Sequence, residues 1–218
     1  MNKIAQLRWE KDIENYDLPH LRLRQVAELV KKINPASYTD LGCAKGTLRL
    51  LTPGIKYTGC DFAVPEGQMD FDFINCDFNR EKLPGKINGE LLITCSGLLE
   101  YIENIDAFLK NIHLILAENG NIIVSYFNMN HLSRIFEMAS GKSFPVHPDW
   151  RGFYSPNDFM QKLAEAGFSI QKIIPVSHGF KNSAAVSATI NVQLTLPEFR
   201  FYSKLLAHQL IYICKKNC

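Results

Sequence analysis

The residues best suited to bind a ligand lie in one stretch, from Ser37 to Asp61. It contains a turn of mostly small residues, Asp40-Leu-Gly-Cys-Ala-Lys-Gly46, directly after a short strand pattern. Small residues let the backbone approach a ligand closely, because glycine has no Cβ to clash with it. Asp61 follows about 20 residues later at the end of the next expected strand, where it could accept hydrogen bonds from ribose hydroxyls. The pattern predicts a site for a nucleoside-bearing cofactor.

Strand and helix patterns alternate along the chain and indicate how this stretch is held. Strand patterns cover residues 38–41, 56–60, 71–76, 90–94, 121–127, 168–176 and 210–214. Helical patterns cover residues 18–33, 105–116, 131–140 and 156–166, and a shorter one falls around 4–13. Pro35 ends the first long helix, and Asn119-Gly120 is expected to end the second. The alternation predicts one doubly wound α/β domain, with a mostly parallel sheet and helices on both faces.

Three parts of the chain depart from a regular βαβ repeat. Only nine residues separate Asp61 from Phe71, too few for an ordinary crossover helix. Segment 128–154, with its aromatic residues, histidines and prolines, is expected to cover the substrate side of the sheet. A long connection containing residues 184–196 joins the last two strands. The helices expected within residues 1–34 are predicted to pack on the sheet as an N-terminal cap.

Composition and charge argue against several classes of protein. The formal net charge is +2 without a basic tract, so nucleic acid is not indicated as the main partner. No window approaches the run of about 18 apolar residues that a membrane span needs. The charged N-terminus leaves no room for the apolar core of a signal peptide. The six cysteines include no CxxC pair, which favours a reducing cytoplasm.

Four of these cysteines fall at or just beyond the ends of expected strands: Cys43, Cys60, Cys76 and Cys95. Four thiols on one edge of a sheet could suggest a metal site. Their spacings lack the close pairs of zinc sites, so we interpret them as small buried thiols and expect no metal.

Taken together, the chain resembles a class I S-adenosylmethionine-dependent methyltransferase over most of its length. Five stretches carry the resemblance: Asp40–Gly46, Asp61, Asp77-Phe78, LLITCSGLLEY (91–101) and FYSPNDFMQKLAEAGFSI (153–170). The closing strand LIYICKK (210–216) also fits. The resemblance implies a Rossmann-like fold and S-adenosylmethionine as cofactor. Departures are Ala44 in place of the middle glycine, Lys45 in the loop, and Tyr101 where histidine is common.

The resemblance also implies which residues bind the cofactor. They are Asp40, Gly42, Cys43, Ala44, Lys45, Gly46, Asp61, Phe62, Asp77, Phe78, Cys95 and Ser96. The loop is expected to meet the methionine part, Asp61 the ribose, and Asp77-Phe78 the adenine. Asp40 could meet the cofactor's amino group or simply support the turn.

The implied reaction is methyl transfer to an oxygen or nitrogen of a small-molecule or sugar-containing acceptor. Segment 128–150 is loosely similar to methyltransferases of the methionine-biosynthesis and surface-glycan type. His147, His131 and Tyr101 are the candidates to contact the acceptor, since they lie on the ligand edge or in the segment covering it. A histidine with a pKa near neutrality could take a proton from the acceptor. The alternative for each histidine is a packing role, and Phe144 and Trp150 could line an acceptor pocket.

Two other functions remain open. One is a regulatory protein that binds the cofactor without catalysis. The other is a nicotinamide-dependent oxidoreductase, although Gly42-x-Ala44-x-x-Thr47 is a poor dinucleotide fingerprint.

Overall fold

The computed structural model describes residues 21–64, 69–83, 85, 87–141, 150–176 and 207–217. Its centre is a seven-stranded sheet in the order β3-β2-β1-β4-β5-β7-β6. The strands are β1 (Ser37–Leu41), β2 (Lys56–Asp61), β3 (Asp72–Asn75), β4 (Glu90–Ser96), β5 (Leu116–Phe127), β6 (Phe168–Val176) and β7 (Gln209–Lys216). Strands β1 to β5 pair in parallel, whereas β7 runs antiparallel to both β5 and β6. The predicted doubly wound, mostly parallel sheet is confirmed.

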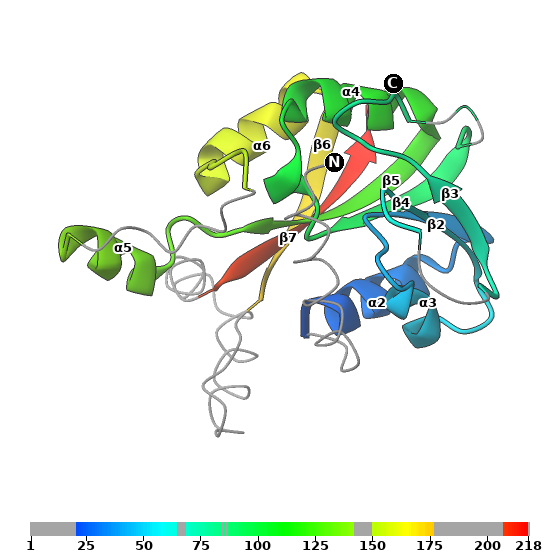
Figure 1. Cartoon of the computed structure of the whole chain (residues 1–218), viewed down its shortest axis with the longest axis horizontal. Helices are drawn as coiled ribbons and strands as arrows, with labels where there is room; N and C mark the ends of the chain where they lie inside the picture. Colours follow the sequence, from blue (N-terminus) through cyan, green and yellow to red (C-terminus); the bar gives the residue numbers. More distant parts are fainter. Residues whose placement is uncertain are drawn as a thin grey trace.

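Helices cover both faces of the sheet (Figure 1). Among the described residues they are α2 (Leu21–Ile33), α3 (Thr47–Leu51), α4 (Ile105–Ile115), α5 (Leu132–Ala139) and α6 (Pro156–Glu165), with a 3₁₀ turn, η2, at Leu99–Tyr101. Figure 1 shows α4 and α6 on one face and α2 and α3 on the other, while α5 extends away from the sheet. The apolar stripe of α2 packs on its face through Val26, Ala27 and Val30.

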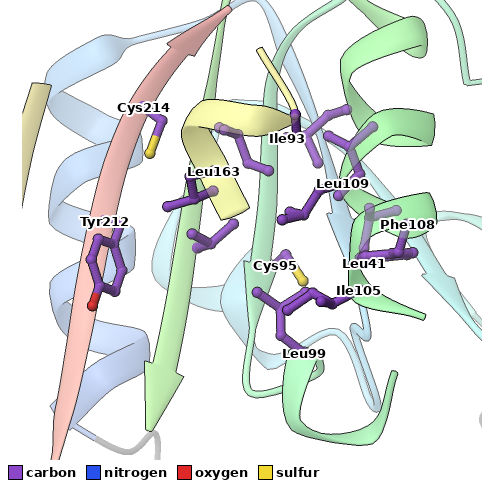
Figure 2. Packing of buried hydrophobic residues seen from close by; sticks show 14 of the residues in the cluster. Leu41, Ile93, Cys95, Leu99, Ile105, Phe108, Leu109, Leu163, Tyr212 and Cys214 are labelled. Atoms are coloured by element: carbon purple, nitrogen blue, oxygen red, sulfur yellow. The ribbon is translucent and has the colours of Figure 1, made fainter. Parts of the chain in front are cut away.

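The larger core lies between the sheet and the helices α4 and α6. Figure 2 shows Leu41, Ile93 and Cys95 of the sheet meeting Ile105 and Leu109 of α4. The side chain of Cys95 is fully buried in this cluster. The five cysteines in the described part of the chain are all buried and free, and for Cys43, Cys60, Cys76 and Cys95 the expected burial is confirmed.

The start of α6 follows its sequence signal closely. The Ser155 hydroxyl accepts a hydrogen bond from the Asp158 amide at 3.2 Å, and the Asp158 carboxylate accepts one from the Ser155 amide at 3.3 Å. This reciprocal capping box satisfies two amides that the helix itself cannot pair. Phe159 and Leu163 then reach the core one turn apart.

The prediction that Asn119-Gly120 ends a helix is wrong. Helix α4 ends at Ile115, and β5 begins at Leu116 rather than at residue 121. Leu116 pairs with Glu90 of β4, and the register shifts before the next pairs. Asn119 has a φ of +62°, a left-handed conformation that serves a strand irregularity as well as a helix end. Asn119 therefore interrupts the regular pairing of β5 and does not end α4.

Other expectations were altered or lie outside the described residues. Strand β3 is shorter than predicted, because Phe71 and Cys76 fall outside its ladder with β2. Residues 62–64 and 69–71 of the β2–β3 connection contain no helix. The helix expected around 4–13, the residues His147 and Phe144, and the connection 184–196 lie outside the described residues. In the part of the chain that is described, no helix is long and apolar enough to cross a membrane.

Candidate cofactor site at the carboxyl edge of the sheet

The turn after β1, residues Gly42–Gly46, is called the cofactor loop below. Its first amide, Gly42 N–H, donates to the Cys60 carbonyl at 2.8 Å, and Gly46 N–H donates to the Cys43 carbonyl at 2.8 Å. Gly42, Ala44 and Gly46 have φ values of +75°, +47° and +71°. A β-carbon at Gly42 would lie 2.9 Å from the Leu98 Cβ, so glycine is required there for space as well as conformation. The loop therefore presents backbone rather than side chain at the ligand edge.

Asp61 holds this loop in place. Its Oδ2 accepts a hydrogen bond from Ala44 N–H at 2.8 Å, and its Oδ1 accepts from Phe62 N–H at 2.8 Å and from Ala63 N–H at 3.4 Å. Burial raises the pKa of Asp61, and these amide bonds offset part of that rise. A carboxylate offers about four acceptor positions, so one remains for a ligand hydroxyl. Support of the loop is observed, and the ribose contact stays a prediction.

Asp40 lies below the loop in β1 and is buried. Its carboxyl accepts hydrogen bonds from the Thr94 hydroxyl at 2.7 Å and the Tyr57 hydroxyl at 3.2 Å. Burial raises the pKa of Asp40 to about 7, although both hydrogen bonds lower it. Of the two roles expected for Asp40, support of the site is the one these contacts show. Thr94 and Tyr57 were not identified from the sequence, because their pairing with Asp40 depends on which strands are neighbours.

The side chains of the loop itself have different roles. Cys43 is buried, and a β-carbon at Gly59 would lie 2.8 Å from its Sγ atom. Cys43 thus anchors the loop on β2, and Gly59, which the sequence analysis did not single out, makes room for it. Lys45 is exposed, so its side chain points away from the protein interior.

The residues predicted to meet the adenine lie after β3. Asp77 accepts a hydrogen bond from Asn79 N–H at 3.1 Å in a local turn. The Phe78 ring packs edge-on against Phe108 of α4, with centroids 5.5 Å apart. The Asn79 side chain bridges two loops, because it donates to the Tyr101 carbonyl at 3.0 Å and accepts from Glu103 N–H at 2.8 Å. Both predicted residues are at the carboxyl edge, and their contact with adenine stays a prediction.

The end of β4 supplies a further set of polar groups. The Ser96 hydroxyl faces the Ser125 hydroxyl of β5 at 3.4 Å, and Gly97 N–H donates to that same Ser125 oxygen at 3.0 Å. Cys95 contributes its side chain to the core, so only its backbone can reach a ligand. Glu100, on η2, is fully buried, and burial raises its pKa. Glu100 was not among the predicted site residues, although it lies in the stretch 91–101 that carries the family resemblance.

Phe62, predicted to contact the cofactor, follows Asp61 at the end of β2 and is half-buried. Its carbonyl accepts a hydrogen bond from the Asn75 side chain at 2.8 Å, which ties the residue to β3. Its backbone is therefore held beside the Asp61 carboxylate.

The candidate acceptor residues lie toward the β5–β7 side of the same edge. The His131 ring packs against the His208 ring with centroids 3.9 Å apart, and His131 is buried. Asn128, fully buried, donates to the Ala207 carbonyl at 2.7 Å and accepts from Asn130 N–H at 3.1 Å. Trp150 packs edge-on against Phe127 at 4.6 Å and lies 6.0 Å from the Phe153 ring. Tyr101 is half-buried on η2.

The carboxyl edge suits a cationic, nucleoside-bearing ligand. The strand order reverses between β1 and β4, which is where doubly wound sheets bind ligands. The cofactor loop offers backbone without bulky side chains, and buried carboxyls of Asp40, Asp61 and Glu100 lie around that point. When ionised, such groups favour a positive charge such as a sulfonium. No cluster of metal-ligating side chains is found among the described residues.

Comparison with known proteins agrees with this geometry. A family model described as a methyltransferase domain matches residues 10–173. Among curated proteins, no sequence matches the chain. Several solved structures share its fold at identities that carry no functional detail.

Three of these structures are similar over nearly the whole chain. A Haloferax volcanii methyltransferase solved with a methyltransferase activator is 17% identical, with 98% of this chain and 96% of that one covered and a TM-score of 0.63. A Burkholderia thailandensis 1,6-didemethyltoxoflavin-N1-methyltransferase with bound S-adenosylhomocysteine is 15% identical, with 99% and 89% covered and a TM-score of 0.62. A Clostridium acetobutylicum S-adenosylmethionine-dependent methyltransferase is 14% identical, with 100% and 99% covered and a TM-score of 0.59.

The family model spans most of the sheet that builds the site, from before α2 into β6. Its match favours methyl transfer over the nicotinamide-dependent oxidoreductase that the sequence left open. The chain belongs to the class I S-adenosylmethionine-dependent methyltransferases and is an enzyme of that family, with S-adenosylmethionine as its cofactor.

Proposed function

We propose that this enzyme methylates an oxygen or nitrogen atom of a small-molecule acceptor by direct displacement. The observation that carries the proposal is the rim formed by the cofactor loop, Asp61 and the end of β4, next to a separate aromatic surface at the end of β5. The Burkholderia neighbour acts on 1,6-didemethyltoxoflavin, as its name states, which supports a small-molecule acceptor. Nothing in the described site favours a sugar-containing acceptor.

The chain's part in such a reaction is alignment and exclusion of water. Bound S-adenosylmethionine supplies an activated methyl group on a sulfonium sulfur. The cofactor loop would hold the methionine part, Asp61 would accept a hydrogen bond from the ribose, and Asp77 and Phe78 would lie beside the adenine. Holding two reactants in line can supply much of the rate of a displacement.

A proton must also leave an acceptor that is a hydroxyl or a protonated amine. His131 and Tyr101 lie at the ends of β5 and β4, on the side of the edge where the acceptor would stand. We propose His131 as the base to test first, because an imidazole titrates near neutral pH whereas a tyrosine does not. His147 is the second histidine to test.

The decisive experiment measures S-adenosylhomocysteine formed from S-adenosylmethionine with a panel of small hydroxyl, amine and nitrogen-heterocycle acceptors. Acceptor-dependent product is expected, and Asp61→Ala should reduce it. Tight cofactor binding by the wild type without product from any acceptor would favour a regulatory protein that does not catalyse.

We also propose a reducing cytoplasmic location. It is supported by the five described cysteines, which are buried and free. Titration of thiols in protein freshly purified under anaerobic conditions should find them all reduced, and a disulfide in that material would contradict the proposal.

A further inference from the structure

A cationic side chain lies where the strand order of the sheet reverses. Arg22, near the start of α2, has its guanidinium against Gly97, the first residue after β4. A β-carbon at Gly97 would lie 2.6 Å from Nη2 and 2.8 Å from Cζ of Arg22. The guanidinium therefore occupies the space that only a glycine leaves open, at a position that also has a φ of +78°.

The next residue, Leu98, connects this position with the cofactor loop. Its Cβ would be 2.9 Å from a β-carbon at Gly42. Gly42 follows β1 and Gly97 follows β4, and these two strands are neighbours in the sheet. The Arg22 guanidinium and the cofactor loop consequently share one rim, at the ligand position of a doubly wound sheet.

Two buried carboxyls from other elements act on the guanidinium. Burial raises the pKa of Asp40 in β1 and of Glu100 in η2, and the positive charge of Arg22 is among the influences that lower both. The carboxyl of Asp40 already accepts hydrogen bonds from Thr94 and Tyr57. The two acids thus favour a positive charge at this point.

Arg22 has donor capacity left over. Its Nε is buried and has no hydrogen-bond partner in the part of the chain that the structure describes. A buried donor without a partner is unfavourable, because it has lost its hydrogen bonds to water without replacing them. A guanidinium can donate two parallel hydrogen bonds to one carboxylate. A bound carboxylate at this rim would satisfy the unused donor.

We propose that Arg22 binds the carboxylate of the methionine part of S-adenosylmethionine, an inference that rests on the proposed role of the cofactor loop. The amino-acid end of the cofactor carries the carboxylate that the guanidinium requires. Arg22 thereby distinguishes the intact cofactor from analogues that lack this group. The competing role is structural, a cation that only neutralises Asp40 and Glu100.

Paired ligands separate these two roles. Decarboxylated S-adenosylmethionine keeps the sulfonium, the amine and the nucleoside, and lacks only the carboxylate. Isothermal titration of the wild type should give affinity about 10- to 100-fold higher for S-adenosylmethionine than for this analogue, as expected for charge-assisted hydrogen bonds. Arg22→Met should lose most of that preference, with affinity for the analogue within about 3-fold of wild type.

The matched control is Arg24→Met, because Arg24 is an exposed arginine on the same helix. It should keep the wild-type preference. Arg22→Lys keeps the charge without the paired donors, so an intermediate preference is expected. Thermal unfolding of each variant shows whether it is folded. If Arg22→Met does not fold, Arg22→Lys tests the proposal in its place, and its preference for S-adenosylmethionine over the analogue must then fall at least 3-fold.

An unchanged preference in Arg22→Met would overturn the assignment of Arg22 to the carboxylate. An equal loss of affinity for both ligands in a folded variant would overturn it as well. Failure of the wild type to bind S-adenosylmethionine at all would instead contradict the proposed function of the site. Equal wild-type affinity for the two ligands would also overturn the inference, while leaving the cofactor site in place.

Discussion

At the β1–β2 corner of the sheet, polar side chains are buried and bonded within the chain, whereas at the β5–β7 corner large apolar side chains face solvent. Asp40 and Asp61 each have 4% of their surface exposed. In contrast, Phe136 of α5 is 66% exposed and Phe153 is 44% exposed. Figure 1 shows α5 extending beyond the β5–β7 side of the sheet.

The difference reflects what each corner has to recognise. The first corner is the proposed site of a cofactor of fixed structure, so its acids and backbone amides can be placed in advance and held by internal hydrogen bonds. The second corner contains rings of Trp150, Phe127 and Phe153, which offer surface without a fixed hydrogen-bonding pattern. With the roles proposed for the two corners, acceptor choice can vary on one side of the sheet while the cofactor side stays constant.

The largest expected effect concerns the buried acid of the first corner. Burial raises the pKa of Asp40 from 3.8 to about 7. Between those values the folded protein retains a proton that the unfolded chain releases, so Asp40 contributes stability below pH 4 that is lost as the pH rises to 7. The free energy of unfolding of Asp40→Asn relative to wild type should rise across that interval by about 4 kcal/mol, at roughly 1.4 kcal/mol per pH unit.

Urea unfolding of both proteins at a series of pH values measures this difference. Asp72→Asn is the control, since Asp72 lies on the exposed edge strand β3 with its side chain 69% exposed. The control should follow the wild-type curve. A constant difference between Asp40→Asn and wild type over the whole interval would show that Asp40 does not titrate there.

The next effect is on cofactor binding at the same corner. Asp61→Ala removes the acceptor of the Ala44, Phe62 and Ala63 amides and the predicted partner of the ribose. The affinity for S-adenosylhomocysteine should fall by about 1–3 kcal/mol, because polar groups are left unpaired. Isothermal titration checks this, and an unchanged dissociation constant would mean that Asp61 is misassigned.

A third substitution tests the buried polar residue of the second corner. Asn128→Ala removes one hydrogen bond to the Ala207 carbonyl and one from the Asn130 amide. The free energy of unfolding should decrease by about 1–2 kcal/mol. Denaturant titration measures this decrease, and Asn130→Ala is the control because the Asn130 side chain is exposed. Equal values for the two variants would show that the β5–β7 corner is held by packing alone.

The smallest effect is expected on α5. Phe136→Ser replaces a ring that is mostly exposed, so the free energy of unfolding should stay within about 0.5 kcal/mol of wild type. Leu109 is fully buried on α4, so Leu109→Ala serves as the contrasting core variant. Its free energy of unfolding should decrease by about 2–5 kcal/mol. Destabilisation by Phe136→Ser comparable to that of Leu109→Ala would show that α5 is packed as tightly as the core beneath α4.

Much of the fold followed from periodicity and local signals. The capping box at Ser155 and the apolar pattern of the strands each involve only a few consecutive residues, so both can be recognised in the sequence alone. Asn119 marks the limit of such signals, because a left-handed residue can end a helix or interrupt a strand, and only the pairing of Leu116 with Glu90 decides between them. The cofactor loop and Asp61 were recognisable for the same local reason, since both lie at strand ends with a defined spacing.

The sequence by itself determined the order of the strands and helices and placed the cofactor loop and Asp61 at the ends of two strands. The hydrogen bond from Ala44 N–H of that loop to Asp61 was visible only in the structure. Only the tertiary structure decided that Thr94 and Tyr57 bind Asp40, that Glu100 is buried, and that Arg22 lies on Gly97. Thr94 is 54 residues from Asp40 in the chain, and the contact exists because β4 lies beside β1. Contacts of this kind depend on how the strands are ordered in space, which no local spacing encodes.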